Sequence, residues 1–294
     1  VEDKKSATYD DHQCSSYDVE ACSWSNIPDE DFALADDNHW TIGQFVWTGF
    51  DYLGEPSPYD TNAWPNHSSM FGIIDLASIP KDRYYLYRSV WNKKAETLHI
   101  LPHWTWPGRE GKVTPVFVYT NHPTAELFIN GKSYGKQSKN NSSLKNRYRL
   151  MWIDAVYEPG EIKVVAYNKD GKAVAEKIVR TAGKPHHIEL VSNRNELTAD
   201  GKDLAYITVK VVDKDGNLCP ADSRQINFSV KGAGKYRAAA NGDPTNLEQF
   251  HLPKMHTFNG MLTAIVQSGE TAGEIVLTAK ASGVKAGNIR IQTK

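Results

Sequence analysis

Apolar and polar residues alternate along most of this chain, from about His99 to its end. Turn pairs such as Asn130-Gly131 and Asp215-Gly216 separate the alternating segments. A period of two predicts strands with one buried face, and Asn-Gly or Asp-Gly between strands predicts a tight turn. Strands are expected at 113–119, 125–129, 150–153, 161–167, 188–191, 205–212, 226–230, 261–266 and 274–279. The pattern therefore predicts a mainly β chain with two immunoglobulin-like β-sandwich domains.

The alternation also sets the expected domain boundaries. Gly183-Lys184-Pro185 interrupts it, so we expect one sandwich over 99–183 and a second over 184–294. Residues 1–98 have a different pattern. A helix is predicted at 28–36, with Pro28 in its first turn, where a missing N–H does no harm. A second helix is predicted at 82–91, with Asp82 as its N-cap.

Between these helices, a strand core from Ile42 to Trp47 leads into a loop rich in aromatic and acidic residues. A (β/α)8 barrel carries its site residues at the C-terminal ends of its strands. Pyranose rings present C–H faces to Trp and Tyr, and hydroxyls to carboxylates and amides. The segment is thus typical of a sugar site. The alternative is a buried strand whose aromatic rings only fill a core.

A complete barrel needs eight strands and about 250 residues. Residues 1–98 offer one clear strand, and 71–75 is a candidate for a further short strand. This stretch can therefore be at most part of a barrel. A lone barrel strand would leave two edges and its apolar faces without partners. We expect the first 95 residues either to dock on the neighbouring sandwich or to self-associate.

The run Gly43-Gln-Phe-Val-Trp-Thr-Gly-Phe-Asp-Tyr-Leu-Gly-Glu-Pro56 resembles the last barrel strand and following loop of glycoside hydrolase family 2. The resemblance continues through Trp64-Pro65, Ser68-Ser69, Phe71-Gly-Ile-Ile-Asp75 and Pro80-Lys-Asp-Arg-Tyr-Tyr-Leu-Tyr87. It is strongest to the bacterial β-galactosidase-like branch with added C-terminal β-domains. Residues 197–217 resemble bacterial immunoglobulin-like repeats of the invasin type. The resemblance implies a C-terminal fragment of a (β/α)8 barrel in 1–98.

By this resemblance, the chain would contribute to binding a β-linked oligo- or polysaccharide in the full enzyme. The expected substrate-binding residues are Trp47, Asp51, Glu55, Tyr59, Trp64, His67 and Ser68. Trp47 would form an aromatic floor under the sugar at the cleavage point. His67 departs from the family, which usually has Arg there. Plain structural roles are the alternative: Asp51 would bond loop backbone, and Glu55 would pair with a basic residue.

Retaining glycosidases need two carboxyl groups about 5–5.5 Å apart. In family 2 both are glutamates on earlier barrel strands, one of them in an Asn-Glu motif. This chain contains neither of these catalytic glutamate motifs. Its only Asn-Glu pair, Asn195-Glu196, lies in the last predicted sandwich. We therefore expect no catalytic residue here, and a chain that is inactive on its own. Galactosides, glucuronides and mannosides all stay open as substrates.

Composition and short motifs bear on several other classes of function. There are 34 basic and 35 acidic residues with no basic stripe, so nucleic-acid binding has no support. No apolar run would span a membrane, and no signal peptide is recognisable, so a periplasmic or extracellular location follows only from the family and module type. Cys14 and Cys22 could pair in an oxidising space. The adjacent His186 and His187 should point to opposite strand faces, so they should not share a metal ion. We expect no cofactor.

Two other classes of function stay open at this point. The sandwiches could bind glycan themselves, for which His103, Trp104 and Trp106 form the candidate aromatic cluster. An interdomain wedge is the competing interpretation of that cluster. The sandwiches could instead be structural spacers, and the scarcity of other exposed aromatic residues on their strands favours this role.

Overall fold

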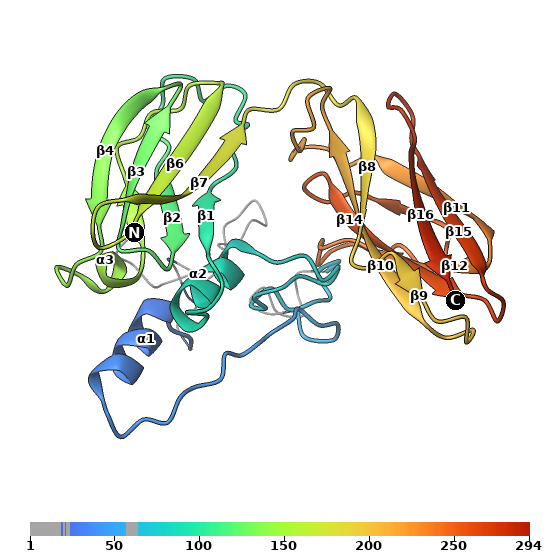
Figure 1. Ribbon diagram of the computed structural model, residues 1–294, viewed down its shortest axis with the longest axis horizontal. Helices are drawn as coiled ribbons and strands as arrows, with labels where there is room; N and C mark the ends of the chain where they lie inside the picture. The colour runs from blue at the N-terminus through green and yellow to red at the C-terminus, as the bar shows by residue number, and fades with distance from the viewer. Residues whose placement is uncertain (1–18, 20, 22–23, 57–63) are drawn as a thin grey trace. The chain divides into compact units, whose positions relative to one another are not determined.

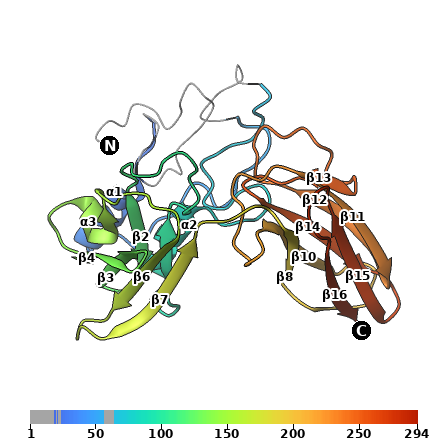
Figure 2. The same ribbon diagram turned by 90° about the horizontal axis from the view of Figure 1, so that it is seen from above.

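A computed structural model describes residues 19, 21, 24–56 and 64–294. The chain forms two compact units (Figures 1 and 2). Unit 1 contains Val1–Asp75 and Pro80–Thr181, and unit 2 contains Leu76–Ile79 and Ala182–Lys294. Strands dominate the described residues of both units, which confirms the predicted mainly β class.

Unit 1 contains a β-sandwich whose sheets follow the predicted alternation. One sheet has the order β1-β2-β5, and the other has the order β4-β3-β6-β7. Its strands are β1 (Leu98–Leu101), β2 (Val116–Thr120), β3 (Thr124–Ile129), β4 (Lys132–Ser138), β5 (Leu150–Trp152), β6 (Glu161–Tyr167) and β7 (Ala173–Arg180). On β6, Ile162, Val164 and Ala166 are fully buried while their neighbours are half-buried. The alternation thus builds one hydrophobic core between the sheets.

Helices cover the outer face of the β1-β2-β5 sheet. They are α1 (Pro28–Asp37), α2 (Asp82–Trp91) and the short α3 (Leu144–Tyr148). Phe32 of α1 and Leu86 of α2 form a second core with Tyr119 of β2. Tyr119 alternates along β2 with Val118, which faces the first core. The expectation that this region docks on the first sandwich is confirmed for its helices.

The predicted strand at Ile42–Trp47 is wrong. Within the described part of the chain, these residues join no ladder, and Ile42 and Phe45 are fully exposed. A strand needs a neighbour to satisfy its backbone N–H and C=O groups. No described segment supplies one here. The proposed strand at 71–75 is also reduced, to isolated bridges that Ile74 makes with Phe50 and Pro80.

Helix α2 begins where predicted, but Asp82 does not cap it. The N-cap position is Lys81, and no side chain bonds the free N–H groups there. Asp82 lies inside the first turn, where its charge favours the positive end of the helix. Its Oδ1 instead lies 2.6 Å from Nε2 of His99 on β1. The carboxylate therefore links the helix to the sheet.

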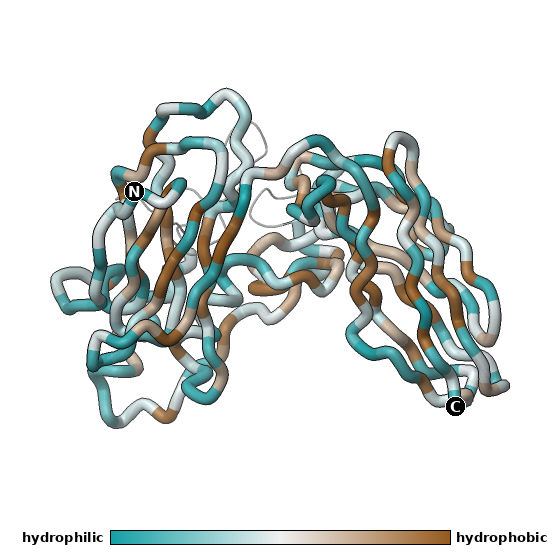
Figure 3. The backbone as a smooth tube through the Cα atoms, turned by 45° about the horizontal axis from the view of Figure 1, so that its top comes forward, coloured by the Kyte–Doolittle hydropathy of each residue, from teal (hydrophilic) through white to brown (hydrophobic). Residues whose placement is uncertain are grey.

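Unit 2 is a second β-sandwich with its own core. One sheet has the order β12-β14-β10-β8, and the other has the order β13-β11-β15-β16-β9. The strands are β8 (His187–Ser192), β9 (Glu196–Leu197), β10 (Leu204–Val212), β11 (Gln225–Gly232), β12 (Gly234–Ala240), β13 (Lys254–His256), β14 (Met261–Ser268), β15 (Gly273–Lys280) and β16 (Gly287–Thr293). Figure 3 shows apolar stretches along these strands and polar turns. The core is mostly aliphatic, and Ala77 joins the unit through a 2.6 Å bond from Thr263 Oγ1 to its carbonyl.

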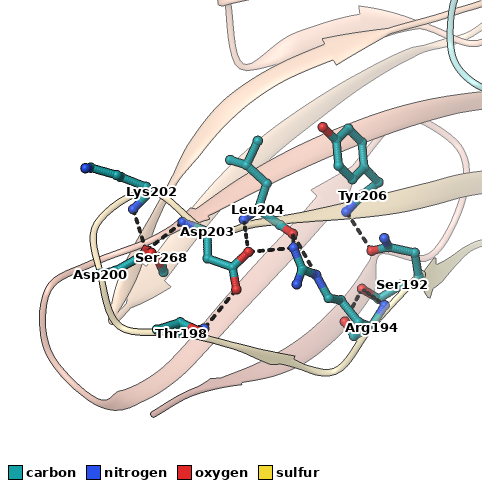
Figure 4. A network of polar contacts seen from close by, with 10 residues as sticks. Ser192, Arg194, Thr198, Asp200, Lys202, Asp203, Leu204, Tyr206 and Ser268 are labelled. Atoms are coloured by element: carbon teal, nitrogen blue, oxygen red, sulfur yellow. Dashed lines mark hydrogen bonds and ion pairs between the residues drawn. The ribbon is translucent and has the colours of Figure 1, made fainter.

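Carboxylates organise the turns of unit 2. Asp203 accepts backbone N–H bonds from Thr198 and Leu204 and also binds Arg194 (Figure 4). The bond from the Thr198 N–H is the main cause that lowers the pKa of Asp203. Asp213 accepts N–H bonds from Gly183, Asp215 and Asn217. Burial alone would raise the pKa of Asp213, but these bonds and the Asn217 amide outweigh it and lower the pKa to about 2.

We expect unit 2 to lose stability in acid. A carboxyl group whose pKa is depressed on folding stabilises the fold above its unfolded value, about 4, and that stability disappears as the pH falls towards 2. Asp213→Asn should lower stability at neutral pH and flatten its decline below pH 4. Asp215→Asn, an exposed carboxylate of the same turn, should leave the decline unchanged.

Denaturant unfolding followed by circular dichroism at neutral pH and at pH 3 measures this effect. All eight tryptophans precede residue 153, so tryptophan fluorescence reports unit 1 and allows its transition to be subtracted. An acid response of Asp213→Asn equal to that of the unaltered chain would contradict the role given to Asp213.

Candidate functional site

The loop after Trp47 is held by backbone bonds to two later segments of unit 1. Asp51 N–H donates to the Ile74 carbonyl at 2.9 Å, and Ser69 N–H donates to the Tyr52 carbonyl at 2.9 Å. Leu53 forms an antiparallel bridge with Ser68. The loop is therefore folded against residues that lie some twenty positions later in the chain, although it contains no regular ladder.

Asp51 lies at the centre of this arrangement and is 7% exposed. Its Oδ2 lies 2.6 Å from Lys81 Nζ, and its Oδ1 accepts the Gly72 N–H at 2.8 Å. Burial raises the pKa of Asp51, while Lys81 and Gly72 oppose that rise. Both carboxylate oxygens thus have partners in the protein, which is the arrangement of a residue that positions a loop.

Sequence reasoning missed Lys81 and Gly72 as partners of Asp51. A Cβ atom at position 72 would lie only 2.3 Å from Asp51 N, so a residue without a side chain is required there. The glycine after Phe71 is the one sequence signal of a close backbone contact. Only the fold shows that the Asp51 backbone makes that contact. Lys81 also donates to the Met70 carbonyl at 2.8 Å, and so joins both sides of the loop.

Aromatic rings form the exposed side of the same loop. Trp47 is 73% exposed, and its ring meets Tyr52 edge to face with centroids 6.2 Å apart. Tyr52 in turn contacts Phe71 with centroids 5.9 Å apart. The Tyr52 hydroxyl donates to the exposed carboxylate of Glu55. The structure thus brings Trp47 and Glu55 together through Tyr52, which is not among the expected substrate-binding residues.

Trp64, His67 and Ser68 lie in the segment that returns along the loop. Ser68 is fully buried, and its hydroxyl bonds the Tyr52 carbonyl at 3.2 Å. His67 Nδ1 lies 2.9 Å from the Pro65 carbonyl, and its ring is 6.3 Å from that of the exposed Trp64. Tyr59 lies outside the described residues, as do Cys14 and Cys22. Their predicted roles stay predictions.

The described residues of this loop can present an aromatic surface and polar groups, but they include no facing pair of carboxyl groups. Asp51 is committed to its ion pair, and Glu55 is exposed beside Tyr52. Among the described residues, no group of three or more His, Cys, Asp or Glu side chains could hold a metal. In that same part of the chain, no helix is long and apolar enough to cross a bilayer.

Two predictions about other residues need correction. His186 and His187 do not point apart, since their Nδ1 atoms lie 3.0 Å from each other. The strand β8 begins only at His187, so His186 does not follow strand geometry. Trp104 is neither a glycan platform nor an interdomain wedge. It is fully buried in the first sandwich core, and its indole N–H donates to the Glu158 carbonyl.

Each of the two sandwiches matches a known protein family or domain model. A family described as "Glycoside hydrolase family 2 C-terminal domain 5" matches residues 188–290. Residues 111–175 match a domain of unknown function, DUF4982. The protein named Beta-galactosidase BoGH2A from Bacteroides ovatus is 43% identical over 96% of this chain and 32% of its own length. A putative beta-glucuronidase from Formosa agariphila is 34% identical over 85% of this chain and 24% of its own length.

Solved structures of glycosidases also superpose on most of this chain. A beta-glycosidase from Bacteroides vulgatus superposes with a TM-score of 0.85 at 34% identity, over 96% of this chain and 34% of that one. A glycosyl hydrolase family 2 member from Bacteroides cellulosilyticus gives a TM-score of 0.78 at 32% identity. The chain therefore spans between 24% and 37% of the length of the relatives described here, and it matches them along most of its own length.

Proposed function

The chain belongs to glycoside hydrolase family 2, and we propose that it forms one wall of the sugar site of a retaining β-glycoside hydrolase. The observation that carries this proposal is the exposed ring of Trp47, which stands beside a loop that Asp51 and Lys81 hold in place. An indole face exposed to 73% can receive the C–H face of a pyranose. Such a contact orients a sugar without performing chemistry on it.

The other residues divide by their contacts. Glu55 and His67 carry polar groups near the aromatic side of the loop and would bind sugar hydroxyls, with Trp64 and Tyr59 lining outer positions. Asp51 and Ser68 are buried, so they act on substrate by positioning the loop. The two catalytic glutamates would come from other parts of the family 2 protein, about 5–5.5 Å apart, one as nucleophile and the other as acid and base.

We divide the chain into a barrel segment at 1–98 and two sandwich domains at 99–183 and 184–294. The exposed Ile42 and Phe45 fit this division, because strands of a surrounding barrel would cover them. Self-association through the same side chains is the competing outcome for the chain alone. A periplasmic or extracellular bacterial location matches an enzyme that acts on β-linked oligo- or polysaccharides.

Substrate choice is the finer part of the proposal. We place β-galactosides first, because a relative with 43% identity carries the name of a β-galactosidase. β-Glucuronides come second, because a relative with 34% identity carries that of a putative β-glucuronidase. Nitrophenyl derivatives of both sugars distinguish the two.

The purified chain should not hydrolyse either nitrophenyl glycoside. Where the structure describes it, the loop supplies an aromatic surface and the engaged carboxylates of Asp51 and Glu55, but no facing carboxyl pair. Release of nitrophenol above the buffer rate measures this directly. Turnover by the chain that Asp51→Asn abolishes would overturn the proposed division of labour.

A further inference from the structure

Unit 1 contains a cavity of about 360 Å³ on the side of the sandwich that carries the helices. Residues of α1, α2 and α3 line it, together with Gln44 and the loops that bear Lys93, Asn121 and Lys139. Figure 1 shows these helices gathered at one end of the sandwich of unit 1. A cavity of this size lies within the range that holds a small organic ligand. It contains none of the residues assigned to the sugar site.

One lining residue has a buried polar atom without a described partner, and another has an ammonium group with spare donors. Gln44 Nε2 is buried, and no described residue accepts a hydrogen bond from it. Lys139 Nζ donates to the Thr120 carbonyl, which uses one of the three N–H donors of an ammonium group. By contrast, Asn121 has partners at both ends of its amide, the Ala95 carbonyl and the Thr97 N–H. The groups left over are donors, so they call for an acceptor.

Charge points in the same direction. Burial, with a contribution from the nearby Lys93 ammonium, lowers the pKa of Lys139 to about 8. In the described part of the chain, no carboxylate oxygen lies within 4 Å of Lys139 Nζ or Lys93 Nζ. The other lining charges are engaged elsewhere: Arg147 binds Asp37, and Asp36 accepts the Tyr148 hydroxyl. Two like charges close together favour an anion between them.

Aromatic rings complete the lining. Phe32 and Tyr148 are buried with ring centroids 5.2 Å apart, whereas Trp91 is 46% exposed. Fixed rings beside unpaired donors suit a ligand with a flat or C–H-rich ring and one anionic group.

We propose that this cavity of unit 1 binds a small ring-bearing carboxylate, whose oxygens accept from Lys139 and Gln44 while its ring lies against the aromatic lining. The carboxylate could belong to a uronate sugar or to an aromatic acid, which share this chemistry. The site is separate from the Trp47 loop and does not depend on the proposed hydrolase role.

Isothermal titration of the full chain tests the proposal with four probes. Sodium glucuronate and sodium benzoate each carry a ring and a carboxylate, and binding of one without the other identifies the source. Galactose has a ring without the charge, and acetate has the charge without the ring. At least one ring-bearing carboxylate should bind about tenfold or more tightly than galactose and acetate, because it alone satisfies both kinds of contact.

Variants locate the site. Lys139→Gln removes the charge and should weaken binding by about tenfold or more. Gln44→Leu removes donors that are unpaired in the free protein, so it should weaken binding without lowering the thermal midpoint. Lys132→Gln changes an exposed lysine at the start of β4, the strand that Lys139 follows; it is the matched control and should bind normally. Affinity should also fall as the pH rises above 8, where Lys139 loses its charge while Lys93, Arg147 and Asp36 still face the cavity.

Failure of every probe to bind would overturn the proposal. So would acetate binding as tightly as both ring-bearing carboxylates, or binding that Lys139→Gln and Gln44→Leu leave unchanged. None of these results bears on glycoside hydrolysis, because the titrated residues lie outside the Trp47 loop.

Discussion

Asp29→Ala should destabilise unit 1 by about 3–5 kcal/mol, the expected cost of leaving one partner of a buried ion pair uncompensated. Asp29, in the first turn of α1, and Arg149, which follows α3, pair with both side chains fully buried. Arg149 also donates to the Tyr119 hydroxyl at 3.3 Å. Removing the carboxylate leaves a guanidinium inside the core that joins the helices to the sandwich.

The neighbouring pair of Asp37 and Arg147 provides a matched control. It joins the same two helical segments with two hydrogen bonds, of 2.8 and 2.9 Å, but Asp37 is largely exposed. Asp37→Ala should therefore cost far less stability than Asp29→Ala, because water screens an exposed ion pair. The double variant Asp29→Ala with Arg149→Leu should recover part of the loss, because it removes the orphaned charge.

Urea unfolding followed by tryptophan fluorescence measures these differences in unit 1 alone, because unit 2 contains no tryptophan. Equal losses for Asp29→Ala and Asp37→Ala would contradict the role assigned to burial.

Trp47→Ala should lower kcat/KM of the assembled enzyme by about 30-fold. Covering the exposed indole with a sugar ring contributes roughly 2 kcal/mol, which corresponds to that factor. The variant is made in a chimera in which this chain replaces the matching third of the Bacteroides ovatus relative, with which it is 43% identical. Initial rates with nitrophenyl β-galactoside provide the measurement.

Two further variants separate stacking from folding. Trp47→Phe keeps an aromatic face and should recover most of the activity. Trp24→Ala removes another tryptophan that is 68% exposed and lies outside the loop, so it should leave the rate unchanged. A Trp47→Ala rate equal to that of the parent chimera would remove Trp47 from the site.

The sandwich strands could be predicted because alternation is a local signal. The predicted span 161–167 coincides with β6, and 205–212 differs from β10 only by Leu204. Strands such as β4 and β7 were not predicted, because their exposed residues do not alternate regularly between apolar and polar. Ile42–Trp47 failed for the opposite reason. Its composition is that of a strand, but pairing depends on neighbours that composition does not reveal.

The sequence predicted a list of candidate site residues but not how they are arranged. The motif selected Trp47 and Asp51, whose exposure and burial turn out to be opposite. Only the fold shows that Lys81, thirty positions later, meets Asp51, and that Gly72 must lack a side chain for this contact. Trp104 is a second example, because the sequence around an aromatic residue does not reveal whether its ring faces a core or a ligand.

Hydrolysis by the chimera with unaltered residues of this chain tests the central claim most directly. The claim is that the chain supplies a sugar-binding wall while the catalytic glutamates lie elsewhere in the family 2 protein. The account predicts that the chimera releases nitrophenol from a β-galactoside or β-glucuronide, whereas neither this chain nor the relative's remaining part does so alone. A folded chimera without activity on either glycoside, or full activity of the relative's remaining part alone, would contradict it.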